Sequence, residues 1–200
     1  FVLSDSPPDR DVIWTSAGVE GAHRFVQRFW RLVDSIVTGN HGEGDAAAND
    51  AILKAAHQAL SNVQTMIPDL RYNSAVAQIY TLVNAIEQAS KSNTGQSALR
   101  QAISMTIQMI APMMPHMAEE CWAKMGFSEM VSNTPWPELN PTLLVETSIT
   151  LPVQINGKKR GDITIDKNLE KPEVEVAVLA LDFVQAALSD KQLKKLIVVP

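Results

Sequence analysis

Cysteine is nearly absent from this 200-residue sequence, which contains only Cys121. A single cysteine cannot form a disulfide within its own chain, and this predicts a reducing, cytoplasmic compartment. Long apolar runs are also missing, because none approaches the roughly 20 residues that a membrane-crossing helix needs. The first residues, FVLSDSPPDRDVIW, lack the basic start and apolar stretch of a secretory signal. They also lack an initiator methionine, and we expect the chain to be cut from a longer one.

An excess of basic residues is missing as well, since the formal net charge is −5. This charge argues against coating of the whole surface with nucleic acid, but it leaves room for a local basic stripe, because phosphates respond to charges within about 10 Å. Apolar residues make up 46% and charged residues 20% of the chain. That balance is typical of globular proteins with a hydrophobic core, and the length suits one large or two small domains.

Apolar residues recur with the 3.6-residue period of helices through most of the first 110 positions. The predicted helices span about residues 18–38, 46–66 and 96–110. A further helix is expected between the second and the last of these, with Asn73 as its N-cap and KSNTG as its break. Short loops join them, and each helix must bury its apolar stripe. The sequence therefore predicts an antiparallel helical bundle, a mainly α fold.

The segment IAPMMPHMAEECW, residues 110–122, predicts a joint between two helices. Pro112 interrupts the helix before it, and Pro115 suits the first turn of the helix after it. Met117, Cys121, Trp122 and Met125 would then share one apolar face, and Gly126 would close the element. We expect Trp14, Trp30 and Trp122 to be core residues and not platforms for stacking bases.

The period changes to two near the C-terminus, after a proline-rich stretch. We predict a helical-bundle domain over residues 1–126, a linker over 127–148 and a small α+β domain over 149–200. The small domain would have ββαβ order, with a helix over about 172–188 and a last strand in KKLIVV.

The hairpin of the small domain presents a question of register. A two-residue turn at Asn156-Gly157 would set apolar residues opposite basic ones on one face. A loop with an odd number of residues would bring together the apolar side chains of Leu151, Val153, Ile163 and Ile165. We therefore predict a loop of three or five residues, with a possible bulge, and a basic cluster at or beside its tip.

Signatures of catalysis are absent, as no glycine-rich phosphate loop, G-x-S-x-G motif or kinase motif occurs. His116 and Glu120 could share a metal, but their spacing matches no zinc-protease pattern, and zinc requires further ligands. Cys121 has no candidate base beside it. The sequence predicts no catalytic residue, no metal site and no cofactor in this chain.

Basic residues supply the candidate binding groups. Arg24, Arg28 and Arg31 are spaced to form one stripe on a helix, and arginine binds phosphate in a forked geometry. The alternative is a solvated face in which these residues pair with Glu20 and Asp34. A second group comprises basic residues of the small domain: Lys158, Lys159, Arg160, Lys191, Lys194 and Lys195.

Several stretches together resemble the C-terminal portion of bacterial-type leucyl-tRNA synthetases. They are SPPDRDVIWTSAGVEGAHRFVQRFWRLV, RYNSAVAQIYTLVNAI, IAPMMPHMAEECW, PWP and VQINGKKRGDITI…KKLIVVP. The most specific pieces are W-T-x-x-G-V-E-G-A and the joint, which valyl and isoleucyl relatives share in looser form. The hairpin after PWP favours the leucyl branch. Cys121 stands where that family usually has an apolar residue.

The resemblance implies a class I anticodon-binding bundle followed by a small C-terminal domain. In that family the bundle leans along the anticodon stem of the tRNA, and the small domain reaches the tRNA elbow. We therefore expect a non-catalytic, monomeric, cytoplasmic tRNA-binding fragment whose partners are tRNA-Leu and the catalytic and editing domains of its parent chain. ATP and magnesium would serve the parent enzyme, and one more short strand would follow residue 200.

On this view Arg24, Arg28 and Arg31 would contact stem phosphates, and Lys158, Lys159, Arg160, Lys194 and Lys195 would lie near the elbow. Two other hypotheses remain open at this point. The chain could be the corresponding tail of a valyl- or isoleucyl-tRNA synthetase, or a helical module that binds a protein partner.

Overall fold

Two compact units make up the chain in the computed structural model, one over Phe1–Leu144 and one over Val145–Pro200. The structure describes residues 1–145, 148–188, 193 and 195–198. Within these residues, no helix combines the length and the apolar character needed to cross a membrane.

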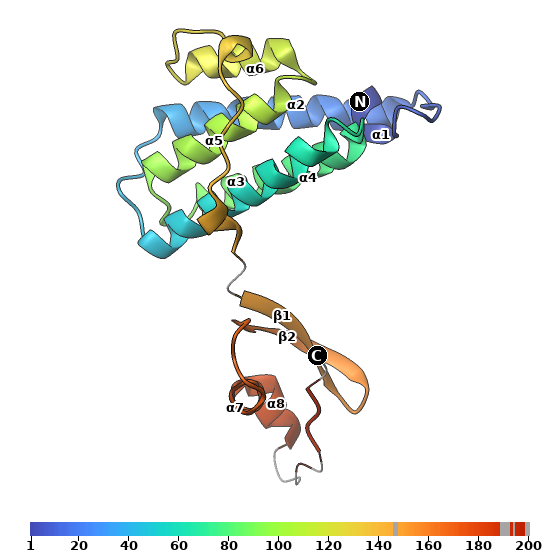
Figure 1. Ribbon diagram of the computed structural model, residues 1–200, viewed down its shortest axis with the longest axis vertical. Coiled ribbons are helices and arrows are strands. Elements are labelled where there is room, and N and C mark those ends of the chain that lie inside the picture. The colour runs from blue at the N-terminus through green and yellow to red at the C-terminus, as the bar shows by residue number, and fades with distance from the viewer. Residues whose placement is uncertain (146–147, 189–192, 194, 199–200) are drawn as a thin grey trace. The chain divides into compact units, whose positions relative to one another are not determined.

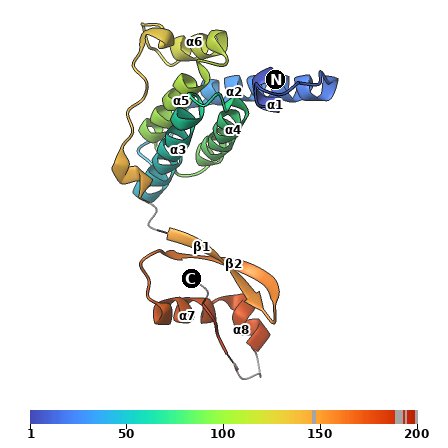
Figure 2. The ribbon, with the colours of Figure 1, turned by 45° about the vertical axis from the view of Figure 1, so that its right-hand side comes forward.

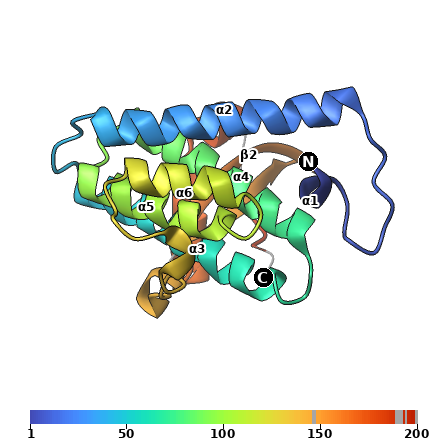
Figure 3. The ribbon, with the colours of Figure 1, turned by 90° about the horizontal axis from the view of Figure 1, so that it is seen from above.

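The first unit is helical, as predicted. Its helices are α1 (Val2–Asp5), α2 (Ser16–Thr38), α3 (Ala46–Met66), α4 (Tyr72–Ala89), α5 (Gln96–Ile110) and α6 (Pro115–Lys124), with two short 3-10 helices, η1 (Val131–Asn133) and η2 (Pro141–Leu144). Helices α3, α4 and α5 pack on one another, and α2 contacts α5 and α6 (Figures 1 and 2). Seen from above, α2 runs along one side of this unit with α6 beside it (Figure 3).

Local sequence determines where these helices begin. The Thr15 hydroxyl accepts a hydrogen bond from the Gly18 N–H (3.2 Å), and the Asp45 carboxylate accepts one from the Ala47 N–H (3.1 Å). The expected cap at Asn73 is wrong. The chain turns at Leu70, where φ is +57°, and the Arg71 N–H donates to the Met66 carbonyl, so α4 begins earlier, at Tyr72.

One continuous hydrophobic core fills the helical unit and contains the predicted apolar stripes. Its largest fully buried side chains are Phe29, Val33, Ile36, Leu60, Ile79, Leu82, Ile86, Leu99, Ile103, Ile107, Met109 and Ile110. Burial of each such side chain contributes about 1.5–3 kcal/mol relative to exposure, and this burial stabilises the bundle.

Residues 127–144 were predicted to belong to a linker, but they belong to the helical unit. The Glu119 carboxylate accepts hydrogen bonds from the N–H groups of Val131 (2.8 Å) and Ser132 (3.2 Å), which begin η1. Val131 is buried in the main core, and Leu139 packs against it. These contacts hold the proline-rich segment on the bundle, and the two units meet at residues 144 and 145 in the sequence.

The second unit contains a hairpin of β1 (Ser148–Ile155) and β2 (Lys158–Asp166), followed by α7 (Lys171–Leu179) and α8 (Asp182–Leu188). Its small hydrophobic cluster is built around Val153, Ile163 and Ile165 of the hairpin, with Val174 and Val184 from the two helices. The predicted set of inward-facing hairpin residues is confirmed, since Leu151 also packs there.

The predicted loop length of this hairpin is wrong. Asn156 (φ +51°) and Gly157 (φ +77°) form a two-residue turn, and Ile155 pairs with Lys158. A bulge restores the apolar register instead: Val153 pairs with Gly161 and Gln154 with Lys159, so Arg160 is the extra residue. The inserted residue shifts by one position which side chains of β2 face inward. A loop with an odd number of residues would have had the same effect.

Two further predictions for the second unit are wrong in detail. The expected single helix over 172–188 is split at Ala180 and Leu181. The side-chain amide of Gln185 donates a hydrogen bond to the Leu179 carbonyl (3.0 Å), which would accept one from a backbone N–H in a continuous helix. Described residues 195–198 of the expected last strand form no strand. Val198 packs against the small cluster through its side chain, without backbone pairing to the hairpin.

Candidate nucleic-acid interface

Arg28 of α2 is half-buried, whereas Arg24 and Arg31 of the predicted stripe are exposed. Its guanidinium carbon lies 5.8 Å from the centre of the Phe25 ring, which stacks on Tyr80 of α4 at 4.0 Å. Burial raises the pKa of Tyr80, and the charge of Arg28 opposes that rise. Arg28 therefore lies beside the seam between the two helices, which the stacked rings of Phe25 and Tyr80 form.

Glu87 near the end of α4 forms an ion pair with a lysine that follows the helix. Lys91 donates a hydrogen bond to it, with 2.9 Å between Nζ and Oε1. This hydrogen bond lowers the pKa of Glu87; partial burial works against the shift, and the charges of Lys91 and Arg28 add to it.

Arg24 and Arg31 lie on the solvent side of α2. Arg24 forms a long ion pair with Glu20 (3.7 Å), and both side chains are about 70% exposed, so the pair is weak. For Arg31 the described residues offer no carboxylate within salt-bridge distance. Asp34 is bound elsewhere, because Lys124 of α6 lies 2.7 Å from it and 5.1 Å from the Trp30 ring.

The tip of the hairpin presents the second basic group. Lys158, Lys159 and Arg160 are all exposed, and Lys159 pairs with Asp162 of the same strand (2.9 Å). Lys158 and Lys159 alternate across the strand, and the bulge at Arg160 interrupts this alternation. Lys195 is exposed, whereas Lys191 and Lys194 lie outside the described residues.

The joint between α5 and α6 is structural. Cys121 is fully buried, and burial raises the pKa of its thiol to about 12, so it stays protonated and is a poor nucleophile at neutral pH. His116 and Glu120 are exposed, while Glu119 caps η1. Across the part of the chain that the structure describes, no group of three or more His, Cys, Asp or Glu side chains could hold a metal ion.

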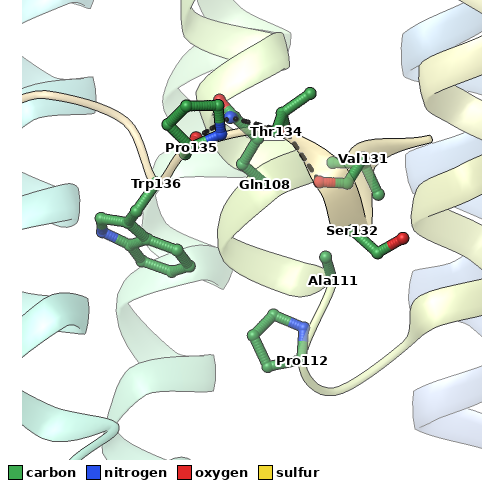
Figure 4. A pocket seen from close by; sticks show the side chains of 8 residues that line it. All are labelled: Gln108, Ala111, Pro112, Val131, Ser132, Thr134, Pro135 and Trp136. Carbon is green, nitrogen blue, oxygen red and sulfur yellow. Dashed lines mark hydrogen bonds between the residues drawn. The ribbon is translucent and has the colours of Figure 1, made fainter. Parts of the chain in front are cut away.

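A small pocket of about 280 Å³ lies beside this joint (Figure 4). Its wall includes Pro112 and Trp136, which is 37% exposed. The side-chain amide of Gln108 donates to the Pro135 carbonyl (2.9 Å) and fixes the PWP segment against α5. The lining contains no charged side chain, so the pocket has no group for acid-base chemistry or for binding an anion by charge.

A clasp between two loops is the strongest polar feature that sequence analysis missed. It joins the α2–α3 loop to the α4–α5 loop. Asn49 accepts a hydrogen bond from the Gly95 N–H (2.6 Å) and donates one to the Glu43 carbonyl (2.9 Å). The Gln96 side chain donates to the Ile36 carbonyl at the end of α2 (2.6 Å). These bonds hold the ends of four helices together.

Comparisons with known proteins relate the chain to tRNA ligases. The family model described as "Anticodon-binding domain of tRNA ligase" matches residues 49–178. The chain belongs to this family. Curated leucine–tRNA ligases are its relatives: that of Afipia carboxidovorans is 48% identical and that of Rhodopseudomonas palustris 50% identical, each over the whole of this chain. The chain spans 24% of the length of each.

A solved structure gives the same result. The LeuRS of Agrobacterium radiobacter K84 (agnB2), solved in a ternary complex with tRNA and LeuAMS, has a TM-score of 0.73 to this chain. The two are 27% identical, and the match covers all of this chain and 26% of that protein. The resemblance to leucyl-tRNA synthetases is thereby confirmed, and these relatives favour the leucyl over the valyl and isoleucyl alternatives.

The structure of this anticodon-binding domain differs from the sequence-based prediction at one tryptophan, and it contains an ion pair that was not predicted. Trp14, expected in the core, is 72% exposed; it lies in the segment before α2 and contacts Phe1 edge-on, with 5.6 Å between the ring centres. Trp30 and Trp122 do pack in the core. The ion pair between Glu87 and Lys91 was not predicted, although their i,i+4 spacing was visible.

His57 binds the segment that leads out of the helical unit. It is 4% exposed, and its Nδ1 accepts a hydrogen bond from the Asn140 N–H (3.2 Å). Burial lowers its pKa below the ordinary 6.5. The accepting nitrogen must be unprotonated, so the contact belongs to neutral His57.

We expect the helical unit to lose stability as the pH falls below about 6.5. In that range His57 of the unfolded chain takes up a proton, whereas His57 of the folded chain stays neutral because its pKa is lower. Each unit of difference between the two pKa values changes the free energy of unfolding by about 1.4 kcal/mol. The loss of stability should cease once the pH is below the pKa of His57 in the folded chain. Thermal unfolding from pH 7.5 to 5.5 measures the effect, and H57Q, which does not titrate, should flatten the profile. An equal decline in H57Q would exclude His57 as its source.

Proposed function

We propose that this chain is the tRNA-docking part of a leucine–tRNA ligase and that it binds tRNA-Leu by shape and by phosphate contacts. Support comes chiefly from the 48–50% identity to leucine–tRNA ligases over the whole chain. The exposed arginines and lysines of both units supply the charge that phosphate binding needs. The part that this chain would play is positional: it would hold the tRNA so that the acceptor end meets a distant active site.

In the helical unit, Arg24 and Arg31 would contact phosphates of the tRNA stem from the open face of α2, with Arg28 beside them in the seam. In the small unit, Lys158, Lys159 and Arg160 would contact the elbow from the hairpin tip, together with Lys194 and Lys195. Contacts of this kind position an RNA without identifying its bases, which suits recognition of a folded tRNA by its shape.

The ligation step would take place in other domains of a longer, monomeric and cytoplasmic enzyme. ATP and magnesium would serve those domains, as would the editing of mischarged tRNA. The present chain carries no ATP-binding signature in its sequence, and the buried Cys121 and the uncharged pocket beside Trp136 offer no reactive group.

Titration of the 200-residue chain with a tRNA-Leu transcript at several salt concentrations tests this proposal. We expect log K to fall with log[salt] by roughly 0.7 to 0.9 for each phosphate neutralised. A tRNA of different variable-arm length serves as the control for shape. Binding that does not change with salt, or an absence of binding at low salt, would contradict the proposal and favour a protein-binding module.

A further inference from the structure

The last segment of the helical unit, residues 139–144, is held on the bundle by one polar and one apolar anchor. Nδ1 of His57 on α3 accepts a hydrogen bond from the Asn140 N–H (3.2 Å), and Leu139 packs against the main core. Within the described part of the chain, His57 is the only side chain outside this segment that forms a hydrogen bond with it. The polar attachment of the segment therefore depends on one ring nitrogen.

Asn140 also organises η2, which packs on α3. The Asn140 side chain accepts hydrogen bonds from the Thr142 N–H (3.1 Å) and the Thr142 hydroxyl (2.7 Å). Its carbonyl accepts another from the Leu143 N–H (3.1 Å). Asn140 thus shapes η2 with its oxygens and binds α3 with its N–H, so the bond to His57 connects the whole short helix to the bundle.

The bond between His57 and Asn140 exists in one protonation state. A neutral imidazole that accepts at Nδ1 carries its proton on Nε2, so a second proton from the solvent must be added to Nδ1. Nδ1 then becomes a donor that faces the Asn140 N–H, and two donors cannot form a hydrogen bond. A buried imidazolium and a buried N–H without a partner are both costly. Movement of the segment away from α3 would expose both groups to water and remove both costs.

The surroundings of His57 offer no compensation for a positive charge. Burial lowers the pKa of His57, and no charge among the described residues contributes to that shift. Residues 139–144 include no titratable side chain, and Glu138 before them is exposed. The other charged or titratable side chains of α3 and of the helices packed on it are Asp50 and Lys54, which pair with each other, Glu87, which pairs with Lys91, Arg100, which donates to the Met125 carbonyl, and Tyr72 and Tyr80.

We propose that His57 and the Asn140 N–H form a latch, closed while His57 is neutral, which opens when His57 takes up a proton and releases η2 from α3. The latch acts on the connector between the two units and needs no RNA. Residues 145–147 separate η2 from β1 in the sequence, and release of η2 would extend this connector to residues 140–147. Residues 140–144 would add up to roughly 17 Å of reach when extended. Mild acid would thus loosen the tether of the small unit while the bundle stays folded.

Amide NMR spectra and hydrogen exchange of the isotope-labelled 200-residue chain, from about pH 7.5 to about pH 5, test the latch. We expect the amide signals of Asn140, Thr142 and Leu143 to shift together with the ring of His57. Protection of the Asn140 N–H, corrected for the intrinsic effect of pH on exchange, should fall about fivefold, the equivalent of one net hydrogen bond. The amide of Leu60 in the core of α3 should keep its protection. Transverse relaxation of the hairpin amides should slow, because a longer connector couples the two units less.

Two substitutions of His57 fix the latch in opposite states. In H57Q the side-chain oxygen can accept the Asn140 N–H at every pH, so the segment should stay closed throughout the titration. In H57L the acceptor is missing, so the Asn140 N–H should be as poorly protected at neutral pH as it is in the acidified unaltered chain. H116Q is the matched control, because His116 is an exposed histidine of α6. This variant should open like the unaltered chain.

Three results would overturn the proposal. The first is titration of His57 without a change in the amide signals of residues 140–143, or opening of H57Q in the same pH range as the unaltered chain. The second is loss of protection at Leu60 in step with Asn140, which would indicate unfolding of the bundle and not release of a segment. The third is unchanged relaxation of the hairpin amides after the segment opens, which would exclude an effect on the connector. Circular dichroism verifies that each variant is folded.

Discussion

Replacing Gly95 by alanine is expected to lower the free energy of unfolding of the helical unit by about 3 kcal/mol, near the upper end for an overpacked site. A Cβ atom at Gly95 would lie 2.0 Å from the Glu43 carbonyl oxygen, which is backbone and cannot turn aside. The two loops of the clasp would separate, and the hydrogen bond between Gly95 and Asn49 would lengthen. The melting temperature of this unit should fall by about 10 °C.

Gly42 provides the matched control for this change. It lies in the α2–α3 loop, the other loop of the clasp, but a Cβ atom there would meet nothing within 4 Å. Its φ of +63° adds only the strain of a left-handed residue, about 1 kcal/mol. If G95A and G42A melt at the same temperature, the close approach of the two loops does not limit stability, and the clasp is weaker than its geometry indicates.

The K158A/K159A/R160A triple substitution is expected to reduce the magnitude of the salt slope for tRNA-Leu by about 2, as three phosphate contacts are removed. Thermal stability should not change, because the three side chains are exposed and the single ion pair among them, Lys159 with Asp162, is a surface pair. Parallel measurements of tRNA affinity and thermal unfolding test both statements.

A K167A/K171A double substitution is the control for the hairpin tip. Lys167 and Lys171 are also exposed cations of the small unit, but they lie at the other end of β2 and at the start of α7. The control should bind tRNA nearly as well as the unaltered chain. Unchanged affinity in a folded triple variant would remove the tip from the interface, and equal losses in both variants would indicate attraction by net charge alone.

Helix positions followed closely from sequence because they depend on local patterns. The predicted spans for α3 and α5 agree with the structure, since the apolar period and the residues that end each helix lie within the helix or next to it. The joint at Pro112 and Pro115 was predictable for the same reason. The start of α4 was not predictable, because the turn at Leu70, which has a positive φ, has no strong signature in the sequence.

The candidate interface was predictable only in part. Spacing placed Arg24 and Arg31 on one face of α2, as the structure has them. It could not show that Arg28 turns toward Phe25 and Tyr80, because Tyr80 is more than 50 residues away in the chain. The pairing of Lys91 with Glu87 is local, and their i,i+4 spacing indicates it.

The sequence by itself determined the mainly helical class, the apolar faces, the joint, the inward set of hairpin residues and the basic groups. Each depends on residues a few positions apart. Tertiary structure alone decided the clasp at Gly95, the packing of residues 127–144 on the bundle, the hydrogen bond between Asn140 and His57, and the stacking of Phe25 on Tyr80. Those features arise where distant segments meet, and their energies depend on distances between atoms that no local pattern specifies.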